Sequence, residues 1–568
     1  MNNFKQVTRF VVLLVILSVQ TTYAAPAVDA GSIQRDIQQL NRSNQPTAVP
    51  PIETENTNAT SSGEVKVLVT AFHFVGAHLL SQAELKAEMR PFLNQTLDYN
   101  DLNKATKAIS QLYQNKGWLA KVFLPPQELQ NGTVTIEINE AKLGEVRLQT
   151  AASARLKPQY ASKVLENGQH KGEPLSSKAL ERAMLIINDT PGFAGQATLS
   201  PGAQTGETDV TLNLADRPIF NAKIWADNNG SRLIGKARLN GLVSFNDLTG
   251  WGDRLTMQAL VSSGLEFVQG GFEFPIGYSG TRVNLGGAVS NYQVNGAGFA
   301  QLNANGESTH MRLGMQHPIV RSRNENLTFR ASIEDMNAKD NALGLQIANK
   351  DYRTLTLGLN GDYSDNLGQG GMFWGGASFT TGHLDLSGNR GDLAADQLSA
   401  RTDGHYNKLN FYVGRQQMLA DKLTAKVLFS AQLADKNLGG FEKFSLGGPM
   451  GVSGFTVGEA AADQGWMLNL EGRHGINQYL SASIMADAGG VCLYKNTWVG
   501  WNAGNSNLHN CYQLASAGLG INFTNQYVDA KLSYARQLSG NRGLDANGKD
   551  SEGESNKNQL WLQISTGF

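Results

Sequence analysis

The chain has 568 residues, of which 17% are charged and 62 are glycine, and its formal net charge at pH 7 is −1. This balance argues against a nucleic-acid partner, since neutralising many phosphates requires a concentrated basic surface. After residue 25 no long uninterrupted apolar run occurs, so a membrane crossing by the rest of the chain requires strands closed into a barrel.

Residues 1–24 have the features of a secretory signal peptide. Lys5 and Arg9 precede an apolar run at residues 10–19, and small residues follow near Ala24. An uncleaved anchor is the alternative, but the run is only about half of the roughly 20 residues that a spanning helix needs. We therefore expect the mature protein to leave the cytoplasm.

A short amphipathic helix is predicted within residues 25–43, because Ile33, Ile37 and Leu40 recur at helical spacing. Residues 44–64 contain three prolines among Thr, Asn and Ser, and almost no large apolar residue. Such a composition predicts an extended, flexible linker. The alternative for both stretches is a disordered N-terminus.

Two small domains with the order strand, helix, helix, strand, strand are predicted next. The first covers residues 65–142, where Ser81 and Glu84 have the spacing of a capping box at the start of a helix. The same order recurs, more weakly, in residues 143–217. Neither domain contains a catalytic constellation.

Residues 218–568 predict a membrane β-barrel of about sixteen antiparallel strands. Apolar and polar residues alternate along many segments, as in residues 327–334, which suits a wall with one lipid face and one lumen face. Long gaps follow odd-numbered strands, among them residues 336–350 and 434–463, while gaps after even-numbered strands are short. Because outer-membrane barrels have short periplasmic turns and long outer loops, this alternation places the two small domains in the periplasm. A soluble β-sandwich or propeller does not explain it.

Phe568 is predicted to end the strand that closes the barrel, because residues 560–568 alternate and terminate in an aromatic residue. Cys492 and Cys511 lie close together after the signal peptide, which in an oxidising compartment suggests one disulfide. Closing that loop would contribute about 3 kcal/mol. Two unpaired buried thiols are the alternative.

The stretch from Leu446 to Phe455 is predicted to pack rather than to extend into solvent. Glycines and a proline exclude a regular strand or helix, whereas apolar residues provide anchors. The loop-length alternation places the stretch on the outer side, between the eleventh and twelfth strands, from where it would fold back into the pore. The alternative is an ordinary glycine-rich surface loop. The residues concerned are Leu446, Gly447, Gly448, Val452, Ser453, Gly454 and Phe455.

Several motifs resemble those of the outer-membrane transporters of two-partner secretion systems, the TpsB family within the superfamily of barrels that carry polypeptide-transport-associated (POTRA) domains. The similarity covers nearly the whole mature chain. Residues 226–230 resemble the start of the family's barrel, and residues 452–455 resemble the Val-Arg-Gly-aromatic signature of its inward-folded sixth outer loop. The motif of the first POTRA domain is matched by Gly117, Trp118, Pro125, Pro126 and Gln127.

The resemblance implies that the loop signature meets an aspartate on the inner barrel wall, matched here by Asp487 and followed by Gly489. Ser453 stands where the family has its arginine. A lumen carboxylate without its cation stays hydrated, protonates or finds another base. Candidate bases are Arg473, Lys426 and Arg330. The resemblance further implies that the helix of residues 25–43 plugs the pore.

By resemblance, the function is export of one large secreted β-helical partner protein, in unfolded or partly folded form, to the bacterial cell surface without ATP. The POTRA domains would recognise this partner in the periplasm. Outer-membrane lipid and, during biogenesis, the barrel-assembly machinery are the other expected partners, and no cofactor or metal is expected. The chain would pass a mostly basic lumen wall, formed by Lys223, Arg238, Arg254, Arg282, Arg312 and Arg330.

Three other functions compete with export. A passive or ligand-gated channel explains the barrel but leaves two POTRA-like domains without a role. A barrel-assembly insertase usually carries more POTRA domains than this chain has room for. An enzyme is disfavoured because no HExxH or GxSxG motif occurs and the nine histidines lack metal-ligand spacing.

Overall fold

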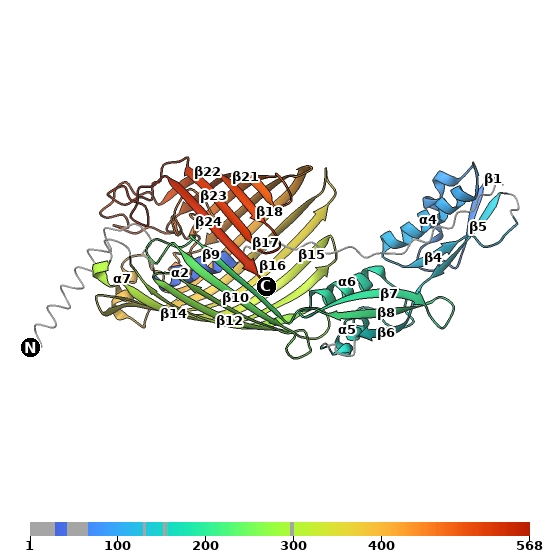
Figure 1. Cartoon of the computed structure of the whole chain (residues 1–568), viewed down its shortest axis with the longest axis horizontal. Helices are drawn as coiled ribbons and strands as arrows, with labels where there is room; N and C mark the ends of the chain where they lie inside the picture. The colour runs from blue at the N-terminus through green and yellow to red at the C-terminus, as the bar shows by residue number, and fades with distance from the viewer. Residues whose placement is uncertain (1–28, 42–65, 129–131, 151–154, 156, 296–299) are drawn as a thin grey trace, which may run out of the picture.

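A computed structural model describes residues 29–41, 66–128, 132–150, 155, 157–295 and 300–568. The predicted signal peptide (1–24) and linker (44–64) lie outside these residues. Two small α/β domains follow one another at one end of a long barrel, and helix α2 lies among the barrel strands (Figure 1). Helix α2 spans Ala30–Asn41, so the predicted helix is present in the described part of residues 25–43.

The first POTRA-like domain has the predicted strand and helix order, with an additional two-stranded pair, β1–β3. Its three-stranded sheet has the order β2-β5-β4, and Leu85, Ile109 and Ile136 are buried between sheet and helices. The predicted capping box forms, since the Ser81 hydroxyl accepts from the Glu84 N–H. The elements are β1 (Val67–Val69), β2 (Ala71–Val75), α3 (Gln82–Glu88), the 3₁₀ turn η1 (Arg90–Phe92), β3 (Gln95–Leu97), α4 (Tyr99–Lys116), β4 (Ala120–Phe123) and β5 (Thr133–Glu140).

The second POTRA-like domain repeats the pattern with a sheet of order β6-β8-β7, in which β6 runs parallel and β7 antiparallel to β8. Two amphipathic helices bury Val164 and Ile187 against this sheet. The elements are β6 (Lys142–Thr150), α5 (Pro158–Glu166), α6 (Ser177–Asp189), β7 (Phe193–Pro201) and β8 (Glu207–Asp216).

In the described chain, sixteen antiparallel strands form a closed barrel, in which each strand pairs with the next and β24 pairs with β9. The predicted fold class is therefore confirmed. The strands are β9 (Phe220–Asp227), β10 (Arg238–Asn246), β11 (Arg254–Val261), β12 (Leu265–Pro275), β13 (Arg282–Gln293), β14 (Asn305–Arg321), β15 (Glu325–Ala342), β16 (Leu345–Asp365), β17 (Gly371–Asp385), β18 (Gly404–Ala420), β19 (Leu423–Ala434), β20 (Gln464–Gly475), β21 (Leu480–Cys492), β22 (Cys511–Thr524), β23 (Asp529–Gln537) and β24 (Asn558–Gly567).

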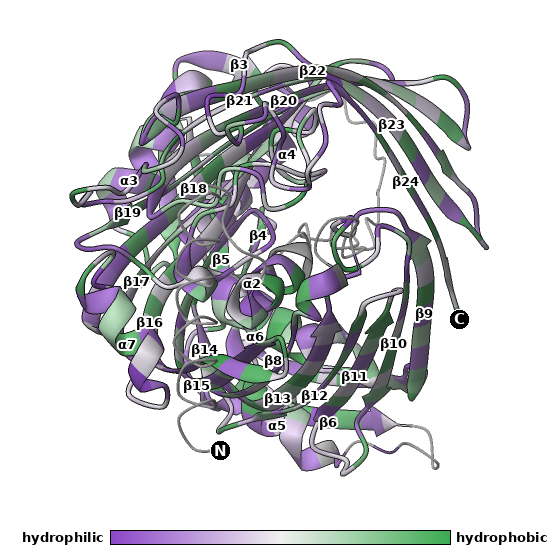
Figure 2. Ribbon diagram, turned by 90° about the vertical axis from the view of Figure 1, so that its left-hand side faces the viewer, coloured by the Kyte–Doolittle hydropathy of each residue, from purple (hydrophilic) through white to green (hydrophobic). Residues whose placement is uncertain are grey.

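Alternation along the strands produces an apolar outer wall. In β13, Leu285 and Val289 are about half exposed, whereas Ala288, Ser290 and Tyr292 are buried toward the lumen. Because successive strand side chains point to opposite faces, a two-residue hydrophobic period suits a wall between lipid and lumen. Figure 2 looks along the barrel and shows helix α2 inside the ring of strands.

The predicted long gap at residues 336–350 is wrong. Strands β15 and β16 continue through it and join in the tight turn Leu343–Gly344, where both residues have positive φ angles (53° and 73°). In this part of β15 the apolar residues Met336 and Ala338 face inward and are buried with the pore helix, so the outward face lacks the apolar residues of a lipid-facing strand. The backbone pairing continues, with one register shift between Asp340 and Asn341. Another outer connection contains a short helix, α7 (Arg390–Gln397).

Phe568 closes the barrel at its periplasmic end. Its N–H donates to the Ala222 carbonyl at 2.9 Å, and the Ala222 N–H donates to the Phe568 carbonyl at 3.2 Å. The β24–β9 ladder has five paired positions, from Gln563 with Asp227 to Gly567 with Lys223.

Candidate functional site: the inward loop and the plugged pore

The outer loop between β19 and β20, residues 435–463, is here called L6, and its central part is buried. Leu446, Val452 and Phe455 are at most 1% exposed, in a cluster with residues of β20, β21 and β22. Gly489 on β21 permits this approach, because a Cβ there would lie 2.2 Å from the Leu446 Cδ1 atom. The loop therefore packs against the barrel through apolar anchors.

The backbone of L6 folds back on itself in a tight loop. The Val452 N–H donates to the Leu446 carbonyl at 2.7 Å, and Gly447 forms a bridge with Val452. Gly448 has a φ of 106°, a conformation that disfavours other residues. Gly454 lies against β22, where an added Cβ would meet the Ser516 Cβ at 2.7 Å.

Asp487 on β21 holds the tip of this tight loop by hydrogen bonds from neutral donors. The Ser453 N–H donates to its Oδ2 atom at 3.1 Å, and the Ser453 hydroxyl donates to the same oxygen. The Ser516 hydroxyl also donates to Oδ2 at 3.2 Å, and the Asn469 amide donates to Oδ1 at 2.8 Å. The predicted meeting of the loop signature with Asp487 thus occurs in the structure without an arginine.

A replacement base was one of three alternatives for Asp487, and in the described structure the carboxylate forms no contact with Arg473, Lys426 or Arg330. Arg473 instead pairs with Glu471 at 2.7 Å, and the Lys426 ammonium lies 5.7 Å from the centre of the Trp374 ring. The buried carboxylate is stabilised by several hydrogen bonds, which compensate for its loss of water.

Three contributors to this anchor were not identified from the sequence: Asn469, Ser516 and Trp561. The Trp561 indole N–H donates to the Ser453 carbonyl at 2.8 Å, and the Asn469 amide also donates to the Gly451 carbonyl at 2.8 Å. Asn469, Asp487 and Ser516 are successive cross-strand partners on β20, β21 and β22. Asn469 and Ser516 could have been found from the sequence by aligning β20 and β22 with β21 around Asp487.

Helix α2 lies in the pore with Ile33 and Ile37 buried against barrel and loop residues. At its first turn, the Ala30 N–H donates to the Asp340 Oδ1 atom of β15 at 3.0 Å. The Arg35 guanidinium donates to the Gly440 carbonyl of L6 at 3.0 Å. The side chain of Leu40, the third residue of the predicted apolar face, falls outside the described side chains.

An ionic cluster fixes the N-terminal end of α2 near the outer hairpin of β15 and β16. The Lys350 ammonium lies 2.8 Å from the Asp29 carboxylate and 3.8 Å from Asp340. The Tyr292 hydroxyl donates to Asp340 at 2.7 Å. These contacts hold helix α2 in the lumen, where it also contacts L6 through Arg35 and Gly440.

Three of the six cations in the predicted basic lumen wall form ion pairs with carboxylates. Arg238 pairs with Asp227 at 2.7 Å, and Arg312 pairs with Glu334 at 3.4 Å. Arg282 likewise pairs with Glu273 on the adjacent strand. These cations thus stabilise the wall, and their availability to a passing chain is reduced.

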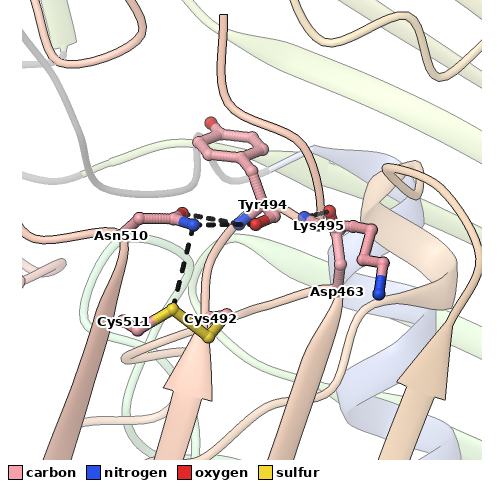
Figure 3. Close-up of a disulfide and its surroundings, with 6 residues drawn as sticks. All are labelled: Asp463, Cys492, Tyr494, Lys495, Asn510 and Cys511. Atoms are coloured by element: carbon pink, nitrogen blue, oxygen red, sulfur yellow. Dashed lines mark hydrogen bonds between the residues drawn. A yellow bond between two sulfur atoms is a disulfide. The ribbon is translucent and has the colours of Figure 1, made fainter.

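A disulfide joins Cys492 and Cys511 at the outer ends of β21 and β22 (Figure 3). It closes the base of the outer loop at residues 493–510, here called L7. In the same region Asp463 at the end of L6 accepts from the Lys495 N–H at 2.8 Å. The disulfide thus holds the base of a loop that packs on L6.

The residues of the predicted POTRA motif have structural positions. Gly117 ends α4 with a φ of 90°, and Trp118 forms a bridge with Ser176 of the second domain. The Gln127 amide exchanges two hydrogen bonds with the backbone of Thr135, at 2.7 and 2.8 Å. Gly117 and Trp118 therefore lie where the two POTRA-like domains join. Gln127 holds the segment that contains Pro125 and Pro126 onto β5.

The second POTRA-like domain is docked on periplasmic turns of the barrel. The Arg182 guanidinium on α6 donates to the carbonyls of Pro318 at 2.6 Å and Ser279 at 3.4 Å. Arg321 donates to both carboxylate oxygens of Asp189, at 2.6 and 2.7 Å. Bidentate arginine–carboxylate pairs are geometrically specific, so the domain has a defined orientation on the barrel.

Within the described ranges no helix is both long and apolar enough to cross a membrane. Among the same residues, no group of three or more His, Cys, Asp and Glu side chains is arranged to hold a metal ion.

A family model described as haemolysin secretion/activation protein ShlB/FhaC/HecB matches residues 206–523, and a model of the ShlB-type POTRA domain matches residues 67–141. The heme/hemopexin transporter protein HuxB of Haemophilus influenzae strain 86-028NP is 28% identical over 553 residues, 94% of each chain. The outer membrane transporter CdiB of Escherichia coli O6:K15:H31 is 27% identical over 498 residues, 82% of this chain and 81% of the relative. The solved structure of CdiB from Escherichia coli has a TM-score of 0.68 at 22% identity, over 95% of this chain and 98% of that chain, which is a likeness of fold.

Proposed function

This chain belongs to the haemolysin secretion/activation protein family ShlB/FhaC/HecB, and from this premise we propose that it exports one large secreted β-helical partner protein through its barrel. The family consists of outer-membrane protein transporters of two-partner secretion and not of enzymes. The observation that carries the proposal is a barrel whose lumen holds a helix and an inward loop, with two POTRA domains at its periplasmic mouth. A passive pore needs no such domains.

The POTRA domains would recognise the partner in the periplasm by strand addition. Strand β7 is at the edge of its sheet, and Leu199 on it is exposed. An exposed edge offers unpaired backbone groups to an extended chain, and alternate side chains then read its sequence. An unfolded partner fits this mode, because a folded β-helix has already paired its strands.

Transport would proceed without ATP. The sequence lacks a GxxxxGK[ST] phosphate loop, and the periplasm supplies no nucleotide. Folding of the partner outside the cell would supply the free energy. The heme/hemopexin transporter and CdiB support a secreted protein as the cargo class, and a gene beside this one is the first place to seek the cargo.

The test is secretion of the protein encoded by the neighbouring gene. Deleting residues 65–217 should abolish its appearance in the medium, while heat-modifiable migration on gels shows that the barrel still folds. The matched control is the full-length chain expressed at the same level. Continued secretion by the deleted form would refute recognition by the POTRA domains.

A further inference from the structure

Two outer loops are held together by charged residues on either side of the β24–β9 seam. They are L1 (residues 228–237, between β9 and β10) and L8 (residues 538–557, between β23 and β24). The Arg232 N–H donates to Glu552 at 2.8 Å, and the Arg232 guanidinium pairs with Glu554 at 3.0 Å. The Lys236 ammonium lies 3.8 Å from Glu552 and 4.0 Å from Glu554. These four residues are here called the L1–L8 clasp.

L1 covers the helix in the pore. Leu233 and Ile234, which lie between the two cations of the clasp, are buried in one cluster with Ile33 and Ile37 of α2. A small cavity remains where the helix meets L1, L6 and L8, and Glu552 lies on its wall. Displacement of α2 from this position therefore requires its contacts with L1 to break.

L8 also holds L6. The Glu459 carboxylate of L6 accepts from the Asn541 amide at 2.6 Å and from the Ser551 N–H at 2.9 Å, both in L8. Ser551 immediately precedes Glu552. One turn of L8 therefore connects the loop above the plug helix with the loop that enters the pore.

Glu552 is a titratable group in an unfavourable place for a charge. Its side chain is 2% exposed, and its Oε2 atom has no hydrogen-bond partner among the described residues. Burial raises the pKa of the Glu552 carboxyl to about 7 and that of the Asp550 carboxyl to about 6. The charged groups around them are Arg232 and Lys236 of L1, Glu554 of L8, Glu459 of L6, and Arg35 and Asp36 of α2.

The direction of the pH effect follows from proton binding. When the clasp opens, Glu552 enters water and its pKa returns to an ordinary value of about 4.3. The closed form then binds a proton near neutral pH and the open form does not, so lowering the pH through the raised pKa favours closure. Between pH 8 and pH 6, the ratio of closed to open forms should rise about tenfold.

We propose that the L1–L8 clasp is a lid that retains the plug helix in the pore and loosens when the medium outside the cell becomes more alkaline. The proposal concerns gating and does not depend on the identity of the exported partner. Channel recordings test the clasp without a partner protein, so a negative result there would leave the proposed export function intact.

The experiment records single channels of the whole protein in planar lipid bilayers with the outer side at pH 6 or pH 8. The opening equilibrium of the native protein should be about tenfold higher at pH 8. Glu552→Gln carries no titratable proton at this position, so its openings should be rare and should change no more than about twofold between the two pH values, which is the contribution of Asp550. Glu554→Gln is the matched control, because it removes a charge from the same clasp but retains Glu552 and its pH response.

A reducible cross-link between the two loops tests the lid itself. Arg232→Cys combined with Glu554→Cys, bridged by a bifunctional methanethiosulfonate reagent that spans the length of the replaced side chains, should suppress openings, and a reductant should restore them. The native protein treated with the same reductant controls for Cys492 and Cys511, and heat-modifiable migration verifies that each variant folds. Equal opening of the native protein at pH 6 and pH 8, a retained tenfold pH response in Glu552→Gln, or unchanged openings in the cross-linked form would each overturn the proposal.

Discussion

Replacing Ser453 by alanine should loosen L6 from the barrel wall. The substitution removes the hydroxyl donor to Asp487 but retains the backbone N–H donor at 3.1 Å. A hydrogen bond to a buried charged group contributes about 2 kcal/mol, because the carboxylate loses a donor that water does not replace. Asp487 keeps its bonds from Ser516 and Asn469, so the loop should detach more often without unfolding.

Hydrogen exchange measures this change directly. In the limit where closing is fast, about 2 kcal/mol corresponds to roughly thirtyfold faster exchange of the protected amides of L6. Peptides covering residues 446–455 should report it, while peptides from α4 in the first POTRA domain should not change. Ser430→Ala is a matched control, since the Ser430 hydroxyl has no hydrogen-bond partner in the described structure. Unchanged exchange in Ser453→Ala would show that the Asp487 contact does not retain the loop.

Three further outcomes follow from the contacts described. Ser453→Arg should bring a cation to Asp487, tighten L6 and lower the conductance in planar bilayers; unchanged conductance would assign retention of the loop to its apolar anchors. Replacing Cys492 and Cys511 by serine should reduce stability by about 3 kcal/mol through the loop they close, seen as a lower midpoint in heat-modifiable migration, and an unchanged midpoint would contradict this. Arg182→Ala should weaken the docking of the second POTRA-like domain on the barrel by about 1–3 kcal/mol, seen as faster hydrogen exchange in α6. Unaltered exchange would mean that the ion pairs hold the domain by themselves.

Local pattern in the sequence determined the elements and their order. The spacing of Ile33 and Ile37 marked the helix that lies in the pore, and the two-residue alternation marked a barrel of sixteen strands. Both signals arise because burial on one face imposes the period of the element. Gly448 and Pro449 likewise marked a segment that is neither strand nor helix.

Tertiary structure decided which side chains meet. Asp487 is surrounded by Ser453, Asn469, Ser516 and Trp561, whose proximity depends on strand register and on the path of a loop. Alternation in one strand records which face is buried but carries no information on the cross-strand partner, so three neutral contributors to the anchor were missed.

The outer hairpin of β15 and β16 was predicted as a long gap because the residue pattern of a strand changes beyond the lipid. Beyond the lipid the outward face of β15 is polar, whereas Met336 and Ala338 on its inward face are buried with the plug helix. The lipid-facing apolar residues are therefore missing while the backbone ladder persists. The sequence determined this protein's class, a plugged barrel with two periplasmic domains. The tertiary structure decided how the plug and loop are held. The contacts of the plug join residues 310 and 405 positions apart, and those of the loop join residues 18 to 108 positions apart.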